Sequence, residues 1–290
     1  MKRDEFSDKR HFFIKNYKKA YTFQFFCVII QNMKKIDSKN PASFSPADSG
    51  EGRVIAGRNA VLELLRSDRS VEKIFLQKDG EGSLKVIRAL AKEKKIPLVS
   101  AEKMKLQTLA GGSFHQGVVA LAAEKEYAEL DTLFRIAADR GEDPFFLVAD
   151  GVEDPHNLGA LIRCAEGAGV HGVILPKRGA VGLTPTVLKS SAGAAEHMAI
   201  CRVANLSRTV DRLKENGVWV YACEADGRPY DKMDYKGPIA LILGSEGFGV
   251  SRLLKEKSDF IVSLPMRGKV NSLNVSCAGA VILYEVLKFR

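Results

Sequence analysis

Residues 264–276 of the 290-residue chain read LPMRGKVNSLNVS, a polar stretch that leads directly into an apolar run. That run, 278–287, carries apolar residues on most faces, which predicts a buried helix. Ser272, Asn274 and Ser276 place hydroxyl and amide groups at its start. The first N–H groups of a helix lack intrahelical partners, so this entrance is a candidate ligand site, with an ordinary helix cap as the alternative.

A second informative segment lies in the middle of the chain. Residues 145–150 read FFLVAD and are followed at 151–163 by GVEDPHNLGALIR, which predicts a buried strand, a turn and a helix. Asn157 is expected at the helix cap and Arg163 two turns inside the helix, with the next strand at 173–175. Ligands of such βαβ sheets bind beyond the carboxyl ends of the strands. A plain cap and a solvated arginine are the alternative interpretation.

A third segment, 239–249, reads IALILGSEGFG and predicts a buried strand that ends in a glycine-rich loop with one carboxylate, Glu246. Glycines let a backbone approach a ligand closely. The G-x-x-G-x-G spacing is not the dinucleotide fingerprint, and the chain contains no G-x-x-x-x-G-K-[ST] motif. By itself the loop is weak evidence of function, because many turns between strands and helices need glycine.

Together, in this order and at these separations, the three segments resemble the motifs of the SpoU (TrmH) branch of the SPOUT methyltransferases. The residues at motif positions are Asn157, Gly159, Arg163, Gly244, Glu246, Gly247, Pro265, Ser272, Leu273, Asn274 and Ser276. The resemblance implies an α/β fold, in which a parallel sheet with flanking helices forms a trefoil knot. It also implies S-adenosylmethionine as methyl donor, an RNA ribose 2′-hydroxyl as acceptor, and a homodimer that completes the active site.

The resemblance further implies roles for individual residues. The catalytic set would be Arg163, Asn157, Glu246, Ser272 and Asn274, and the cofactor contacts would be Gly244, Leu264, Met266, Ser272 and Leu273. Arg163 would contact the RNA. Because a guanidinium stays protonated, it would stabilise the developing alkoxide by its charge, and an RNA phosphate or water would take the proton of the 2′-hydroxyl. No metal is required, and the scattered histidines show no metal-ligand spacing.

The segment 53–124 predicts a small α/β domain upstream of these motifs. Its expected elements are a turn into a helix within 55–65, strands at 73–76, 97–99 and 117–121, and helices at 83–94 and 104–110. The pattern is similar to the substrate RNA-binding domain of SpoU-type enzymes, which is of ribosomal-protein type. Candidate phosphate contacts are Arg53 and Arg58, with Arg66 and Arg69 beside them; a solvated basic face is the alternative. We expect a charged, partly helical connector at 125–143 and the methyltransferase domain at 144–290.

Composition agrees with an RNA partner. The formal net charge of +9 favours a polyanion, although an acidic membrane surface or simple solubility would also suit it. The five cysteines show no C-x-x-C spacing and mostly lie in apolar segments, which is typical of reduced thiols in the cytoplasm.

The amino-terminal segment 1–52 is predicted to be a disordered basic tail and flexible linker. Its apolar run at 23–30 is too short to span a bilayer, so we expect no membrane partner. Met33, followed by two lysines, is a candidate for the true start of the protein. A basic targeting or RNA-tethering arm is the alternative interpretation.

The amino-terminal module favours a guanosine of 23S ribosomal RNA as the substrate, because the module is similar to that of bacterial enzymes with this target. Transfer RNA enzymes of the family usually carry short helical extensions instead, and a transfer RNA guanosine remains the alternative. A non-catalytic RNA-binding assembly factor is a further alternative, although such a factor has no need of all five candidate catalytic residues.

Overall fold

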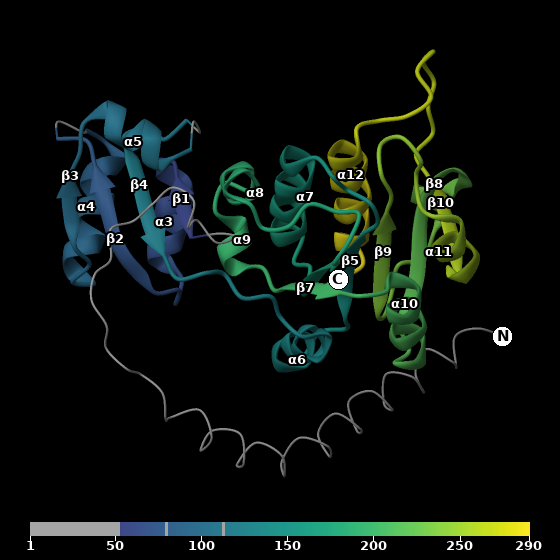
Figure 1. Ribbon diagram of the computed structural model, residues 1–290. Helices are drawn as coiled ribbons and strands as arrows, with labels where there is room; N and C mark the ends of the chain where they lie inside the picture. The colour runs from purple at the N-terminus through teal and green to yellow at the C-terminus, as the bar shows by residue number, and fades with distance from the viewer. Residues whose placement is uncertain (1–52, 79–80, 112–113) are drawn as a thin grey trace, which may run out of the picture.

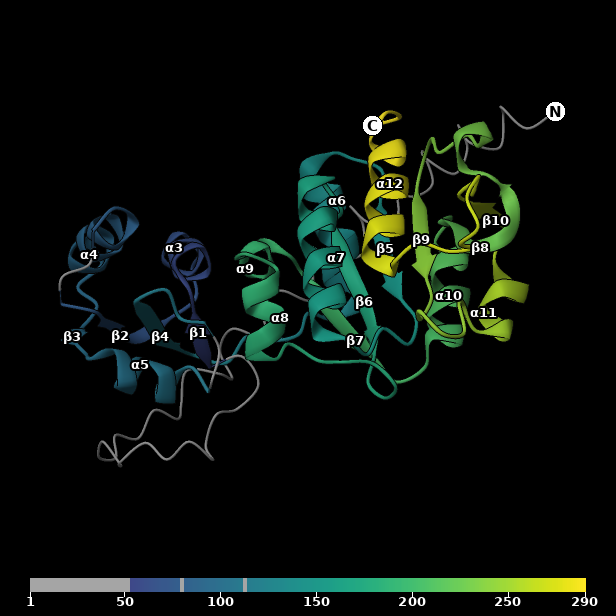
Figure 2. The same cartoon turned by 90° about the horizontal axis from the view of Figure 1, so that it is seen from above.

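The computed structural model describes residues 53–78, 81–111 and 114–290 (Figure 1). The predictions for 1–52, including a start at Met33, lie outside these residues. The chain forms a smaller and a larger α/β domain, and the smaller one lies beside α8 (Pro185–Ser190) and α9 (Ala194–His197) of the larger one (Figures 1 and 2). Over the described ranges, no helix is long and apolar enough to cross a membrane.

The smaller domain is a four-stranded sheet with helices on both faces. Its elements are β1 (Val54–Ala56), α3 (Arg58–Arg66), β2 (Val71–Leu76), α4 (Ser83–Glu93), β3 (Leu98–Ser100), α5 (Lys103–Leu109) and β4 (Val118–Ala122). The strand order is β1-β4-β2-β3, and only β2 and β3 pair in parallel. Helices α3 and α4 cover one face and α5 the other (Figure 2). The predicted helices and strands are confirmed, and the structure adds β1.

The larger domain is built on a six-stranded sheet in the order β10-β8-β9-β5-β6-β7, in which every pair is parallel. Its remaining elements are α6 (Leu130–Arg140), β5 (Phe145–Ala149), α7 (Pro155–Gly167), β6 (Gly172–Pro176), β7 (Ile200–Val203), α10 (Leu206–Glu215), β8 (Trp219–Pro229), η2 (Tyr230–Lys232), β9 (Ile239–Leu243), α11 (Arg252–Lys257), β10 (Phe260–Ser263) and α12 (Val275–Leu287). The strands predicted at 145–150, 173–175 and 239–243 are confirmed.

Both faces of this sheet are buried, which explains why its central strands read as continuous apolar runs. In β5, Phe145 and Leu147 belong to the cluster that contains α7 and α12, whereas Phe146 and Val148 belong to the cluster of α6, α10 and α11. The segment 125–143, predicted as a connector, contains α6, whose Phe134 ring lies 4.9 Å from that of Phe146. Helix α6 is therefore part of the core of the larger domain.

Helix α12 returns the chain from the edge strand β10 to the middle of the sheet, beside α7 (Figures 1 and 2). Gly279 makes this close packing possible, because a Cβ there would lie 2.5 Å from Leu161 and 2.7 Å from Leu243. The helix begins at Val275, slightly earlier than predicted. The trefoil knot stays a prediction.

The two domains meet through a buried ion pair. Arg69 and Glu196 approach to 2.8 Å, with side chains only 9% and 3% exposed, and Lys125 donates to the Glu196 carbonyl oxygen. His197 Nε2 and Glu63 Oε2 also lie 3.0 Å apart across the interface, within hydrogen-bond distance. The suggestion that Arg69 contacts phosphate is wrong, because the need to neutralise a buried carboxylate holds this guanidinium inside the domain interface.

Candidate active site

The site lies where the carboxyl ends of neighbouring parallel strands meet. Strand β9 ends at Leu243 and continues into the glycine loop 244–250, in which Ser245 and Gly249 exchange backbone hydrogen bonds of 3.1 and 2.9 Å. Asp150, directly after β5, accepts a 2.7 Å hydrogen bond from the backbone N–H of Ser251. These bonds hold the loop in a folded shape above the sheet.

Two glycines of this loop have no room for a side chain. A Cβ on Gly244 would lie 1.9 Å from the carbonyl carbon of Gly249, so the two backbones need glycine to pass each other. Gly249 has a φ of +67°, and a Cβ there would lie 2.4 Å from Glu224 Oε1. The same Glu224 oxygen accepts the N–H of Val250. The loop is therefore fixed against Glu224, in the middle of β8.

Helix α7 begins with a cap that differs from the predicted one. Asp154 is the N-cap, and its two carboxylate oxygens accept the N–H groups of His156 and Asn157, each at 3.2 Å. The prediction that Asn157 caps the helix is wrong. Pro155 sits at the first helical position, where proline is favoured, so the cap precedes it. The Asn157 side chain is instead free to donate to Glu246 Oε1 at 2.7 Å.

Helix α12 begins at the same place and supplies the third member of a network. The Asn274 Oδ1 caps the helix by accepting the N–H groups of Ser276 at 2.9 Å and Cys277 at 3.3 Å. This fixes the orientation of the amide, whose Nδ2 donates to Asn157 Oδ1 at 2.9 Å and to Glu246 Oε1 at 2.6 Å. We call Asn157, Glu246 and Asn274 the polar triad.

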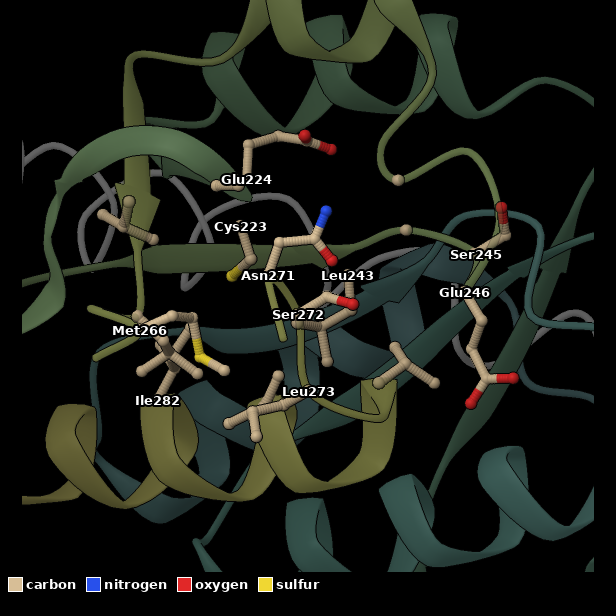
Figure 3. A pocket seen from close by; sticks show the side chains of 17 residues that line it. Cys223, Glu224, Leu243, Ser245, Glu246, Met266, Asn271, Ser272, Leu273 and Ile282 are labelled. Atoms are coloured by element: carbon tan, nitrogen blue, oxygen red, sulfur yellow. The ribbon is translucent and has the colours of Figure 1, made fainter. Parts of the chain in front are cut away.

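A cavity opens beside the polar triad, and Glu246 belongs to both (Figure 3). The structure brings together all the residues that were predicted to hold the cofactor: Gly244, Leu264, Met266, Ser272 and Leu273 line this cavity. Sequence reasoning missed Cys223, Glu224 and Asn271, which also line it. Glu224 could have been found as a carboxylate that follows the apolar run 219–223, since polar groups after parallel strands tend to line ligand sites.

The cavity suits a ligand with an apolar ring and a positive charge. Leu243, Val262 and Ile282 supply apolar walls, while the carboxylates of Glu224 and Glu246 stand on two sides of the opening (Figure 3). Burial, together with the adjacent Glu224, raises the pKa of the Cys223 thiol, so this wall remains uncharged at neutral pH. An adenosine with a cationic sulfonium has these properties.

Three predicted residues lie outside this cluster. Arg163 is exposed on α7 and does not line the cavity. In the smaller domain, Arg53 pairs with Glu72 at 2.9 Å, and the Nε of Arg58 donates to the Gln116 carbonyl oxygen at 3.0 Å. The RNA-binding roles of these three arginines stay predictions.

The chain is similar to known proteins over most of its length. The profile of the SpoU rRNA Methylase family matches residues 144–284, and a profile described as RNA 2′-O ribose methyltransferase substrate binding matches residues 54–128. YacO of Bacillus subtilis, assigned to the TrmH family of tRNA/rRNA methyltransferases, is 47% identical over 238 residues, which cover 81% of this chain and 95% of YacO. A relative from Staphylococcus haemolyticus with the same family assignment is 45% identical over 242 residues, covering 83% of this chain and 97% of that protein.

Solved structures show the same fold. The SpoU methyltransferase AviRb from Streptomyces viridochromogenes, in complex with the cofactor AdoMet, aligns with a TM-score of 0.67 at 21% identity over 81% of this chain and 89% of AviRb. An AdoMet-bound rRNA methyltransferase from Sinorhizobium meliloti aligns with a TM-score of 0.66 at 24% identity, over 82% and 88% of the two chains.

Fold, cavity and comparisons together define an RNA methyltransferase that uses S-adenosylmethionine. More particularly, the chain belongs to the SpoU (TrmH) family. Its amino-terminal domain is the substrate-binding domain of that family. The alternative of a non-catalytic assembly factor is therefore set aside.

Proposed function

We propose that the enzyme methylates the 2′-hydroxyl of a ribose, and that its target is a guanosine of 23S ribosomal RNA. The observation that supports this most is the polar triad at the mouth of the cofactor cavity, because it joins one side chain from each of the three motifs. The match of 54–128 to a 2′-O ribose substrate-binding profile supports the acceptor group. The choice of ribosomal RNA rests on the presence of this domain.

In this proposal the protein positions the acceptor and stabilises charge. S-adenosylmethionine, when bound, supplies an electrophilic methyl group to the cavity. Asn157, Ser272 and Asn274 orient the ribose, which brings its 2′-oxygen into line for transfer. Arg163 stabilises the alkoxide as the proton leaves to an RNA phosphate or to water, because a guanidinium is a permanent cation. Glu246 orients Arg163 or the ribose.

We also propose a homodimer in which Arg163 acts across subunits. Arg163 follows Asn157 by six helical residues, which puts its Cα about 9 Å further along α7 and its side chain about 120° around the helix axis. Within one protomer the two side chains therefore point in different directions. On α12, Val281 and Tyr284 are 40% and 49% exposed on one face, which offers an apolar contact for a second copy.

A cytoplasmic location is the remaining part of the proposal. It is supported by an RNA substrate and by four free cysteines among the described residues: Cys164, Cys201, Cys223 and Cys277.

The proposed reaction is tested by transfer of tritiated methyl groups to purified, unmodified 23S ribosomal RNA and transfer RNA. Nucleoside mass spectrometry of the product distinguishes a ribose methyl from a base methyl, and mapping identifies the nucleotide. We expect 2′-O-methylguanosine in 23S ribosomal RNA. Label in transfer RNA alone would overturn the ribosomal target, and a base methyl would overturn the 2′-hydroxyl acceptor.

Subunit complementation tests the homodimer. Arg163→Ala and Gly244→Val proteins are each expected to be inactive, for different reasons. If the site is shared, mixed dimers contain one site with an intact Arg163 and an intact glycine loop, so activity returns on mixing. Absence of recovery, with mixed dimers demonstrated by differently tagged subunits, would place both groups in the same protomer.

A further inference from the structure

A second cavity lies beside the edge strand β7, whereas the cofactor cavity lies beside β8, β9 and β10 toward the other edge of the sheet. Three arginines line it, Arg202 at the end of β7 and Arg208 and Arg212 on α10, with Glu129 at the start of α6. We call it the arginine cavity. It is open to solvent and has no part in the methyl-transfer site described above.

The charge of this cavity is positive. Arg202, Arg208, Arg212 and the nearby Lys177 outnumber the two carboxylates around them, Glu129 and Asp131. Two of the arginines have structural contacts, because Arg212 pairs with Asp131 and the Nη2 of Arg202 donates to the Lys177 carbonyl oxygen at 3.0 Å.

Arg208 differs from these two arginines. Its side chain is exposed, and the guanidinium makes no hydrogen bond or ion pair with the residues that the structure describes. A guanidinium that lines a positive cavity without a carboxylate partner suits an external anion, and its fork of N–H groups matches the oxygens of a phosphate.

The arginine cavity lies where the chain enters the larger domain from the smaller one. Ala128, in the segment between the domains, donates its N–H to the Ile200 carbonyl oxygen at 2.7 Å, beside β7. The Arg202 guanidinium lies 5.1 Å from the centre of the Tyr127 ring of the same segment. RNA held by the substrate-binding domain would therefore meet this cavity on its way to the cofactor.

A second unpaired arginine lies between the two cavities. Arg178 follows β6, which stands between β7 and β5, and it is exposed and has no side-chain partner among the described residues. The adjacent Gly179 is close to the glycine loop, since a Cβ on Gly151 would lie 3.9 Å from the Gly179 carbonyl oxygen and 3.5 Å from the Ser245 Cβ. From β7 to β9 the sheet spans three strand spacings, about 14 Å, a distance that a few nucleotides cover.

We propose that Arg208 in the arginine cavity and Arg178 bind phosphates of the RNA strand that leads to the methylated nucleotide. These contacts would lie along the carboxyl edge of the sheet and connect the substrate-binding domain to the active site. They are independent of sequence, because they touch the backbone rather than the bases. The proposal rests on the RNA methyltransferase activity of the family and not on the choice of 23S ribosomal RNA.

The test measures the affinity of the full-length protein for an unstructured single-stranded RNA 20-mer by fluorescence anisotropy over a series of salt concentrations. For Arg178→Gln and Arg208→Gln we expect Kd to rise about fivefold each. The slope of log affinity against log salt should flatten by about 0.7 for each lost phosphate contact, and by about 1.4 in the double variant. Arg208→Lys keeps the charge and should keep most of the slope.

Arg140→Gln is the matched control, because Arg140 is an exposed arginine at the end of α6. It precedes β5 and so lies toward the amino ends of the strands, away from Arg178 and Arg208. This control should leave affinity and slope unchanged, and S-adenosylmethionine binding should be unchanged in every variant. A double variant that keeps the wild-type slope would overturn the proposal, as would a loss in Arg140→Gln of the same size. Because the 20-mer carries no target site, a failed ribosomal assignment leaves this result intact.

Discussion

Asn274 has two roles, and the substitution Asn274→Asp separates them. Its Oδ1 caps α12 by accepting the N–H groups of Ser276 and Cys277, and its Nδ2 donates to Glu246 and Asn157. Aspartate is as good an N-cap as asparagine, so the helix should keep its start. An ionised aspartate has no donor, however, and it would place a second carboxylate against Glu246.

The size of the effect follows from the contacts that are lost. The 2.6 Å bond to Glu246 Oε1 involves a charged acceptor, and such bonds contribute about 1.5–3 kcal/mol. Repulsion between two carboxylates about 4 Å apart adds about 1 kcal/mol near the water limit, which applies because both side chains are exposed. A total of about 2.5–4 kcal/mol in the transition state corresponds to a rate about 100-fold to 1000-fold lower.

The assay measures kcat/KM, thermal stability and S-adenosylmethionine affinity of Asn274→Asp and of two control variants. Asn274→Ser keeps a cap without adding charge. Asn274→Ala removes the cap, at a cost of about 1 kcal/mol. We expect Asn274→Asp to keep the Tm and lose activity at pH 7.5. It should recover part of that activity near pH 5.5, because a proton shared by the two carboxylates restores a donor.

Two results would refute this reasoning. Asn274→Asp with near-normal kcat/KM at pH 7.5 would show that the polar triad is not needed for transfer. A Tm as low as that of Asn274→Ala would show that the cap and the triad cannot be separated.

Further outcomes are expected elsewhere in the chain. Arg163→Ala should lower methylation about 100-fold or more without changing S-adenosylmethionine affinity in calorimetry, and near-normal turnover would exclude a catalytic role. Gly244→Ala should abolish cofactor binding in the same assay, because the new Cβ would lie within 2.2 Å of loop backbone atoms. Removing one partner of the buried pair, as in Arg69→Ala, should destabilise the protein by about 3–5 kcal/mol in denaturant unfolding, whereas Arg69→Met with Glu196→Leu should recover most of that loss. Burial lowers the pKa of His171, whose Nδ1 accepts a backbone N–H, so the unfolded state binds more protons below about pH 6.5. Stability should therefore fall as the pH drops from 7 to 5, and His171→Gln should flatten that decline in Tm.

The central strands could be predicted from the sequence because they are buried on both faces. Residues 145–149 and 239–243 read as apolar runs that need no periodicity to be recognised. Strand β8 was harder, because its buried part ends at Ala222 and the strand continues through polar residues to Pro229. Glu224 was not predicted as a cavity residue, because it lies in this polar part of β8.

Contacts between distant residues could not be predicted from local patterns. Arg69 and Glu196 are 127 positions apart, and nothing near Arg69 in the sequence distinguishes it from a solvated arginine. The cap of α7 was a different kind of error. Asp154 followed by Pro155 is a stronger start signal than Asn157, and it puts the cap three residues upstream of the expected position.

The hydrogen bonding of Glu246 is compatible with the role that we propose for it in the reaction. Both amide donors of the polar triad contact Oε1, and Oε2 has no partner in the part of the chain that the structure describes. A carboxylate oxygen without a partner at the mouth of a cavity can accept a hydroxyl or one arm of a guanidinium without breaking either amide bond. Asn157 and Asn274 thus fix the direction of Glu246, and in the proposed mechanism Oε2 would accept from the ribose or from Arg163 of a second subunit. Glu246→Gln keeps the size of the side chain but makes it a weaker hydrogen-bond acceptor. We therefore expect this variant to lose more methyl-transfer activity than S-adenosylmethionine affinity. Equal losses in both would assign Glu246 to cofactor binding.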